Sequence, residues 1–180
     1  MQLESKLPEV GVTIFTKMSQ MATQYNAINL SQGFPDFPVD PQLIELVNHY
    51  MQKGHNQYAP MPGHHALRKA IATKTANCSG WKPSVEENIT VTCGAIEAIH
   101  STIAALIGHG DEVIILEPAY DAYEPIINLH GGVAVGVPLR SSDYSIDWEL
   151  VWDAINEQTK LLIINSPHNP SGAILTQEGL

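Results

Sequence analysis

Residues 161–172 read LLIINSPHNPSG, and this stretch indicates a buried strand followed by a polar turn. Its first four residues are apolar, which is typical of a strand buried on both faces of a parallel sheet. The strand cannot continue, because the two prolines that follow lack the N–H group that a sheet ladder needs. Polar side chains therefore follow a strand at the edge where open α/β sheets bind ligands. These side chains are Asn165, His168 and Asn169.

Upstream of this stretch, short apolar runs alternate with helical patterns. The predicted strands are 89–92, 113–116, 133–137 and 161–164. The predicted helices between them are 95–107, 121–130 and 147–155. This alternation predicts a three-layer α/β/α fold with a mainly parallel sheet covered by helices on both faces. Right-handed crossovers place the carboxyl ends of the strands on one side, where three polar loops then converge.

The N-terminal part of the chain has a helical pattern and no predicted strand. Helices are expected over 13–24, 41–53 and 65–77, separated by loops at 29–38 and 56–63. Asp40 and Pro41 form a strong helix start, because an N-cap acceptor precedes proline at the first helical position. Gly54 is expected to end that helix.

Composition excludes several classes of function. The 180 residues carry a formal net charge of −10, which argues against nucleic acid or an anionic membrane as partner. No apolar run approaches the roughly 18 residues of a membrane span. The first ten residues contain no apolar stretch of the kind found in secretion signals, so none is expected there. Cys78 and Cys93 show no metal-ligand spacing, so they predict free, buried thiols in a reducing cytoplasm.

Three loops carry residue types that suit a planar, phosphorylated cofactor. Gly94 ends a predicted strand and starts a helix, so its N–H and those of Ala95 and Ile96 form a possible phosphate cradle; the alternative is a glycine needed only for packing. Tyr120 offers a stacking ring, or else covers a helix start. Asn169 offers an amide donor, or else stabilises a turn.

Five motifs together identify a family resemblance. They are NLSQGFPDF at 29–37, NQYAPMPG at 56–63, VTCGAIEA at 91–98, EPAYDAYEP at 117–125 and INSPHNPSG at 164–172. The set resembles the class I, fold-type I pyridoxal-phosphate aminotransferases, in the branch of the methionine and kynurenine (glutamine-type) aminotransferases. TIFTKMS at 13–19 favours the methionine type. The resemblance extends over essentially the whole chain, which corresponds to somewhat under half of a complete member.

The resemblance implies a role for each matching position. Gly94, Ala95 and Ile96 would hold the phosphate of pyridoxal 5′-phosphate, Tyr120 would stack on its ring, and Asn169 would bond its phenolic oxygen. Two further positions concern the substrate and a partner subunit. Gly33 would meet the substrate carboxylate, and Tyr58 would reach the cofactor phosphate of the neighbouring subunit, so a homodimer is implied. Side-chain pocket residues would include Val12, Ile14 and Phe34.

The resemblance also implies a domain division and a reaction. Residues 1–40 would form an N-terminal arm with a substrate loop, and residues 41–180 the first part of the cofactor-binding large domain. The reaction would move an amino group from methionine, or a similar apolar or aromatic amino acid, to a 2-oxo acid in the cytoplasm. The alternatives are cysteine-S-conjugate β-lyase chemistry on the same scaffold and a non-catalytic truncated fragment.

None of the lysines matches the family motif for the lysine that holds the cofactor as a Schiff base. The 180 residues are therefore expected to be inactive alone, with no catalytic residue among them, and Lys160 is expected at the far end of the sheet. No metal site is expected. His64 and His65 lie in a loop without clustered carboxylates, whereas His100 and His130 are expected to be surface or hydrogen-bonded residues.

Overall fold

The computed structural model describes residues 4–8, 10–33 and 35–176. The chain divides into two compact units, which are described separately. The first, here called the α/β unit, contains the residues from Cys93 onward together with those up to Val10. The second, here called the helical unit, is Gly11–Thr92. The division predicted at residue 40 stays a prediction.

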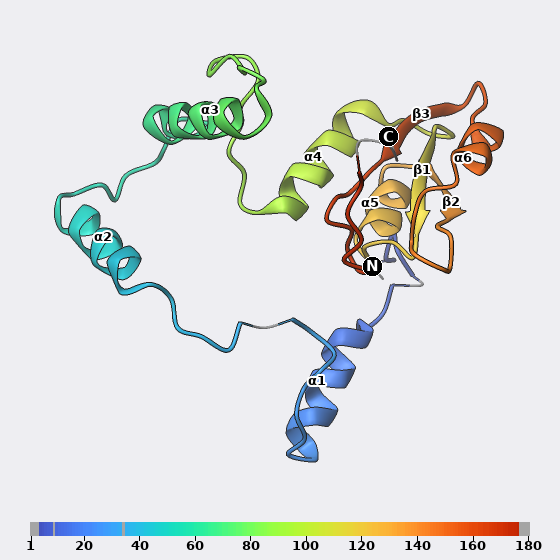
Figure 1. Cartoon of the computed structure of the whole chain (residues 1–180), viewed down its shortest axis with the longest axis horizontal. Helices are drawn as coiled ribbons and strands as arrows, with labels where there is room; N and C mark the ends of the chain where they lie inside the picture. Colours follow the sequence, from blue (N-terminus) through green and yellow to red (C-terminus); the bar gives the residue numbers. More distant parts are fainter. Residues whose placement is uncertain (1–3, 9, 34, 177–180) are drawn as a thin grey trace. The chain divides into compact units, whose positions relative to one another are not determined.

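The α/β unit contains a three-stranded parallel sheet (Figure 1). Its elements in chain order are α4 (Ala95–Leu106), β1 (Glu112–Glu117), α5 (Tyr123–Leu129), β2 (Val133–Pro138), α6 (Trp148–Ala154) and β3 (Thr159–Ile163). The spatial order of the strands is β2-β1-β3, so β1 is central. Three of the four predicted strands and all three predicted helices of this region are confirmed within a few residues.

The central strand is buried on both faces, which explains its uninterrupted apolar sequence. Successive side chains of a strand point to opposite faces. Val113 and Ile115 accordingly pack with residues of α4 and α5, including Ile103 and Ile127. Ile114 and Leu116 face the opposite side and pack with a cluster that contains Val151 of α6. Helices thus cover both faces of the sheet, which confirms the predicted three-layer α/β/α arrangement.

The predicted strand at 89–92 is wrong. These residues belong to the helical unit, and they form no ladder with any described strand. Instead the Val91 N–H donates to the carbonyl of Pro62 at 3.0 Å, a single loop hydrogen bond. Gly63 permits this approach, because a Cβ there would lie 2.7 Å from the Val91 Cβ. β-Branched residues fit an extended backbone, but a strand also needs a continuous row of paired neighbours.

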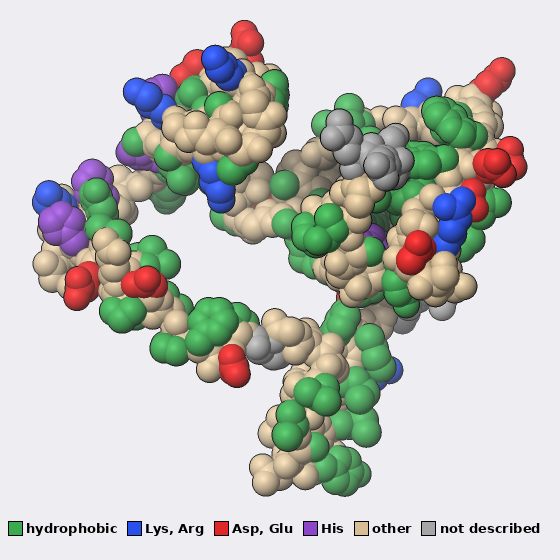
Figure 2. Space-filling view, in the orientation of Figure 1, with side chains coloured by type: hydrophobic (Ala, Val, Ile, Leu, Met, Phe, Trp, Pro, Cys, Tyr) green, Lys and Arg blue, Asp and Glu red, His purple; other side chains and the backbone are tan. Residues whose placement is uncertain are grey.

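The helical unit contains α1 (Ile14–Gln24), α2 (Pro41–Gln52) and α3 (His65–Ser79). The cap of α2 is the predicted one: the Asp40 carboxylate accepts the Gln42 N–H at 2.8 Å, and Pro41 is the first helical residue. Neither α1 nor α2 has a buried residue, and Figure 2 shows hydrophobic side chains on the surface of both. Packing against other described residues therefore does not explain why α1 and α2 carry so many apolar side chains.

Two expectations about the surface have different outcomes. Within the described ranges no helix combines the length and apolarity needed to cross a membrane. Cys78 and Cys93 are free, but both are exposed, so the prediction that they are buried is wrong. Cys93 directly precedes Gly94, the N-cap of α4, and Cys78 lies in the last turn of α3, two residues before its C-cap Gly80.

Candidate functional site

The turn after β1 and the loop after β3 leave the sheet at the same edge. β1 and β3 pair in parallel, with Val113 opposite Leu161 and Ile115 opposite Ile163, so both strands end on one side (Figure 1). Tyr120 lies in the first of these connections and Asn169 in the second. The parallel pairing thus brings these two predicted residues to one sheet edge.

Tyr120 is held in place by α5. Its carbonyl accepts the Tyr123 N–H at 3.1 Å, and the two rings meet edge-on with centroids 5.6 Å apart. Tyr120 is half-buried against the core cluster that contains Tyr123. Burial raises the pKa of the Tyr123 hydroxyl, and the neighbouring Tyr120 adds to this effect. Tyr120 therefore covers the start of α5, and its position after β1 still lets it offer a ring to a ligand.

The loop after β3 is folded tightly around His168. The His168 N–H donates to the Ala173 carbonyl, the Gly172 N–H donates to the His168 carbonyl, and the His168 Nδ1 lies near the Ser171 Oγ, each at 2.7 Å. His168 is buried, so its side chain serves the loop itself. The sequence pattern could not separate this role from that of a ligand-binding histidine.

Asn169 lies next to His168 but in a different environment. Its side chain is exposed, and its amide makes no hydrogen bond to any described residue. An amide group has two donors and an acceptor, so this side chain keeps its full capacity for a ligand. The folded loop behind it supplies a fixed backbone.

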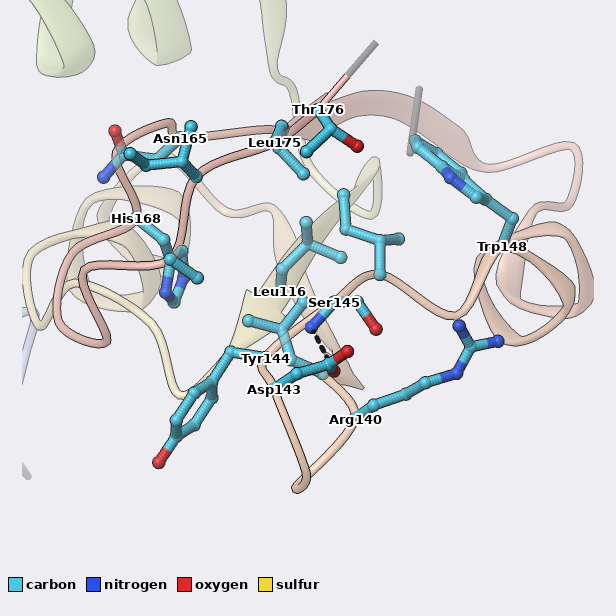
Figure 3. A pocket seen from close by; sticks show the side chains of 14 residues that line it. Leu116, Arg140, Asp143, Tyr144, Ser145, Trp148, Asn165, His168, Leu175 and Thr176 are labelled. Carbon is cyan, nitrogen blue, oxygen red and sulfur yellow. Dashed lines mark hydrogen bonds between the residues drawn. The ribbon is translucent and has the colours of Figure 1, made fainter. Parts of the chain in front are cut away.

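A pocket lies beside this loop (Figure 3). Its volume is about 360 Å³, and its lining comes from the end of β1, the connection from β2 to α6, and the loop after β3. Asn165 and His168 line it, whereas Gly94, Tyr120 and Asn169 do not. The pocket was not anticipated, because nothing in residues 139–146 distinguishes them from an ordinary connection.

Two acidic side chains stabilise the rim of this pocket. The Asp143 carboxylate accepts the backbone N–H of Ser145 at 3.0 Å, and this bond, with smaller contributions from neighbouring groups, lowers the pKa of Asp143. The Asp147 carboxylate lies 3.2 Å from a guanidinium nitrogen of Arg140. Both carboxylates have protein partners, so they hold the connection in place rather than facing an unoccupied cation position.

The third predicted loop begins α4. Gly94 is the N-cap of this helix with φ 95°, a conformation that favours glycine, and a carboxylate oxygen of Glu97 accepts the N–H of Cys93. A helix leaves the N–H groups of its first turn without intrahelical acceptors, and its dipole favours an anion there. α4 continues into β1 through residues 107–111 and packs back along it, so its N-terminus is directed toward the edge where β1 ends.

Other predicted residues lie elsewhere. Lys160 is the second residue of β3 and is exposed at the opposite edge from Asn169, as expected. Gly33 and Tyr58 belong to the helical unit and are exposed, so their roles stay predictions. The same is true of Val12 and Ile14, which are exposed in that unit. Phe34 lies outside the described residues.

The described residues contain no group of three or more His, Cys, Asp and Glu side chains that could hold a metal ion. His65 lies 3.3 Å from a carboxylate oxygen of Glu86, and both side chains are about two-thirds exposed. An exposed pair of this kind is a weak surface contact.

Comparison with known proteins identifies the family. Residues 25–180 match the sequence family described as aminotransferase class I and II. The chain belongs to this family. Two curated relatives are the methionine aminotransferase of Escherichia coli K12, 48% identical, and the kynurenine–oxoglutarate transaminase of Dictyostelium discoideum, 34% identical. These matches cover 97% and 94% of this chain but only 45% and 43% of the relatives.

The fold of the aminotransferase chain also matches a solved structure. An Escherichia coli protein, YbdL, for which its crystallographic report identifies a methionine aminotransferase function, superposes with a TM-score of 0.95 at 47% identity. The superposition covers 99% of this chain and 47% of that one. The chain therefore spans about half the length of the relatives it matches. The resemblance predicted from the five motifs is confirmed.

The family uses pyridoxal phosphate, and the residue types at the sheet edge fit this cofactor. The start of α4 suits a phosphate group. The ring of Tyr120 suits stacking on a planar heterocycle, and the unpartnered amide of Asn169 suits a ring oxygen. Among the described residues no buried side-chain oxygen lacks a hydrogen-bond partner, so no buried, unpaired carboxylate opposes an anion there.

Proposed function

We propose that the whole protein transfers an amino group from methionine, or a similar apolar or aromatic amino acid, to a 2-oxo acid. The identity of 48% to the methionine aminotransferase over 97% of the chain supports the choice of donor. The TM-score of 0.95 to YbdL supports the same choice. The parallel pairing of β1 and β3 carries the proposal, because it brings Tyr120 and Asn169 to one sheet edge.

In this proposal each residue at the edge binds or orients one part of pyridoxal 5′-phosphate. When bound, the cofactor stores the electrons that are released at the substrate α-carbon. The N–H groups of Gly94, Ala95 and Ile96 hold its phosphate, Tyr120 covers one face of its ring, and the Asn169 amide donates to its phenolic oxygen. These contacts fix the ring so that it faces the substrate.

Two residues of the helical unit have further proposed roles. The backbone of Gly33 binds the substrate carboxylate, and Tyr58 reaches the cofactor phosphate of a second subunit, so the active form is a homodimer. The full exposure of Tyr58, with no described residue covering it, is consistent with a contact to another chain.

The exposed free thiols of Cys78 and Cys93 support a reducing compartment, the cytoplasm.

The 180 residues supply cofactor contacts but, in this proposal, no proton-transfer group. Lys160 lies at the wrong edge of the sheet to serve as the Schiff-base lysine. The remaining lysines also match no family lysine motif: Lys6 of the α/β unit, and Lys17, Lys53, Lys69, Lys74 and Lys82 of the helical unit. We therefore infer that residues 1–180 alone do not catalyse transamination.

The experiment uses the full-length protein with pyridoxal 5′-phosphate. Methionine, kynurenine and aspartate are offered in turn as amino donors with a panel of 2-oxo acids, and the new oxo acid is quantified. The expected result is the highest kcat/KM with methionine. A donor preference for aspartate would overturn the proposed substrate, and a lack of amino transfer from every donor would overturn the proposed activity.

A further inference from the structure

Two histidines from different helices meet in the α/β unit. His100 lies on α4, and His130 is the C-cap residue of α5. Their Nε2 atoms are 3.3 Å apart, and their ring centroids are 4.8 Å apart with the planes at 67°. Both side chains are half-buried, and neither ring has another hydrogen-bond partner among the described residues. Among the described residues, each imidazole therefore has only the other ring as a hydrogen-bond partner.

The spacing of the two nitrogens is the one that a shared metal ion requires. Zinc binds histidine nitrogen at about 2.0–2.1 Å with tetrahedral geometry, which puts two such nitrogens about 3.3–3.4 Å apart. We propose that His100 and His130 form a two-histidine site for a divalent transition-metal ion of the zinc class, with both Nε2 atoms as ligands. Water molecules complete the coordination, because the described residues offer no third His, Cys, Asp or Glu ligand.

The protein holds the two ligands in position before any ion arrives. Ile103 of α4 packs in one buried cluster with Ile126 and Ile127 of α5, so the two helices form a stable pair. A preformed pair loses little side-chain freedom on binding, which favours affinity. The electrostatic setting also favours a cation. His130 lies at the carboxyl end of α5, where the helix dipole is negative, and the chain carries a formal net charge of −10.

A bound ion would connect α4 to α5, and it would act by stabilising the folded α/β unit. This inference stands independently of the proposed aminotransferase activity, because neither histidine is among the residues assigned to the cofactor. An ion that binds only the folded state raises the unfolding temperature.

The test is a zinc titration of the full-length protein after removal of metals by a chelator. Zinc chloride is added against a chromophoric competitor, and the number of ions bound per chain and the thermal midpoint are measured for the wild type, H100Q and H130Q. The expected result is that each variant binds one ion fewer than the wild type and loses the zinc-dependent rise in thermal midpoint. The matched control is H64Q, because His64 is exposed and its side chain forms no cap hydrogen bond.

Circular dichroism shows whether each variant is folded. If H100Q fails to fold, H130Q still decides, because it removes the second ligand at a helix end. Zinc binding and a zinc-dependent midpoint that are equal in the wild type and both variants would overturn the site. The absence of any zinc binding by the wild type would also overturn it.

Discussion

The side chain of Asn169 combines exposure with a fixed backbone. The loop around it is closed by the two backbone hydrogen bonds of His168, yet its own amide has no partner among the described residues. A side chain of this kind contributes little to folding stability and is available to a ligand. Asn169 therefore allows function and stability to be tested separately.

Asn169→Ala in the full-length protein is expected to weaken cofactor binding by about tenfold to a hundredfold, the value of a hydrogen bond to a charged acceptor. The free energy of unfolding without cofactor should change little, because no protein contact is lost. Equilibrium dialysis against pyridoxal 5′-phosphate measures the first quantity, and urea denaturation the second. Asn165→Ala is the matched control: Asn165 lies in the same loop but lines the pocket of Figure 3. Equal cofactor affinity in the two variants would contradict the role of Asn169.

Gly94 gives a second test at the predicted phosphate cradle. Its φ of 95° lies in a region that other residues rarely adopt, and a Cβ there would meet no atom within 4 Å. Gly94→Ala should therefore cost about 1–3 kcal/mol through the backbone alone. Gly80→Ala is matched, because Gly80 has φ 76° and equally open surroundings at the end of α3.

Both glycine variants should lower the urea midpoint, Gly94→Ala by more, because its ψ of 170° lies in a region essentially restricted to glycine, whereas Gly80 has the left-handed helical conformation. Only Gly94→Ala is expected to weaken cofactor binding, because it alone moves the N–H groups at the start of α4. Cofactor affinity that falls equally in both variants would mean that general destabilisation, not the cradle, is responsible.

Sequence reasoning located these residues through their position after strands. The prolines at 118, 167 and 170 indicate where β1 and β3 must stop, and this places Tyr120 and Asn169 beyond the strand ends. It could not separate His168, which the loop buries, from its exposed neighbour Asn169. That difference depends on the two hydrogen bonds that close the loop, and residue types alone do not specify them.

The link between α3 and the segment that follows it depends on one buried arginine. Arg68 is 4% exposed; its Nε donates to the Ile89 carbonyl at 3.0 Å, and a terminal nitrogen donates to the Val85 carbonyl. The exposed carboxylate of Glu86 lies 3.4 Å from the same guanidinium. The planar guanidinium reaches both carbonyls at once, which a lysine ammonium cannot do in the same geometry.

Arg68→Met is therefore expected to destabilise the protein by about 2–4 kcal/mol, because it leaves carbonyl acceptors without their donors. Urea denaturation of the full-length protein measures the loss in unfolding free energy. The unfolding free energy of Arg68→Lys should lie between those of the wild type and Arg68→Met. Glu86→Gln is the control, since an exposed ion pair contributes about 0–1 kcal/mol. A loss for Glu86→Gln as large as that for Arg68→Met would show that the ion pair, and not the carbonyl contacts, holds the segment.

Helices and buried strands could be predicted here because local signals agreed with tertiary packing. The cap at Asp40 and the apolar run of β1 each match their element within a residue or two. The segment 89–92 could not be predicted, because its β-branched residues indicate an extended backbone but not its partner. The meeting of His100 and His130 depends on how α4 packs on α5, which no spacing along the chain encodes.

The residues with proposed roles are divided between the two units. The α/β unit carries the residues assigned to the cofactor, whereas the helical unit carries Gly33 and Tyr58, assigned to the substrate and a second subunit. The apolar residues of α1 and α2 are exposed within the described chain, as expected of helices that pack against other parts of a longer or dimeric protein. The chain covers 45% of the methionine aminotransferase that it matches.

Residues 1–180, prepared alone, test this division directly. No lysine of the chain matches the family motif, and Lys160 lies at the edge of the sheet opposite Asn169. Added pyridoxal 5′-phosphate should therefore keep the absorption spectrum of the free aldehyde at one equivalent, and methionine with a 2-oxo acid should yield no new oxo acid. The full-length protein under the same conditions provides the positive control. A Schiff-base band that forms at one equivalent with residues 1–180 and is lost in Lys160→Arg would contradict the assignment, because it would place the reactive amine within this chain.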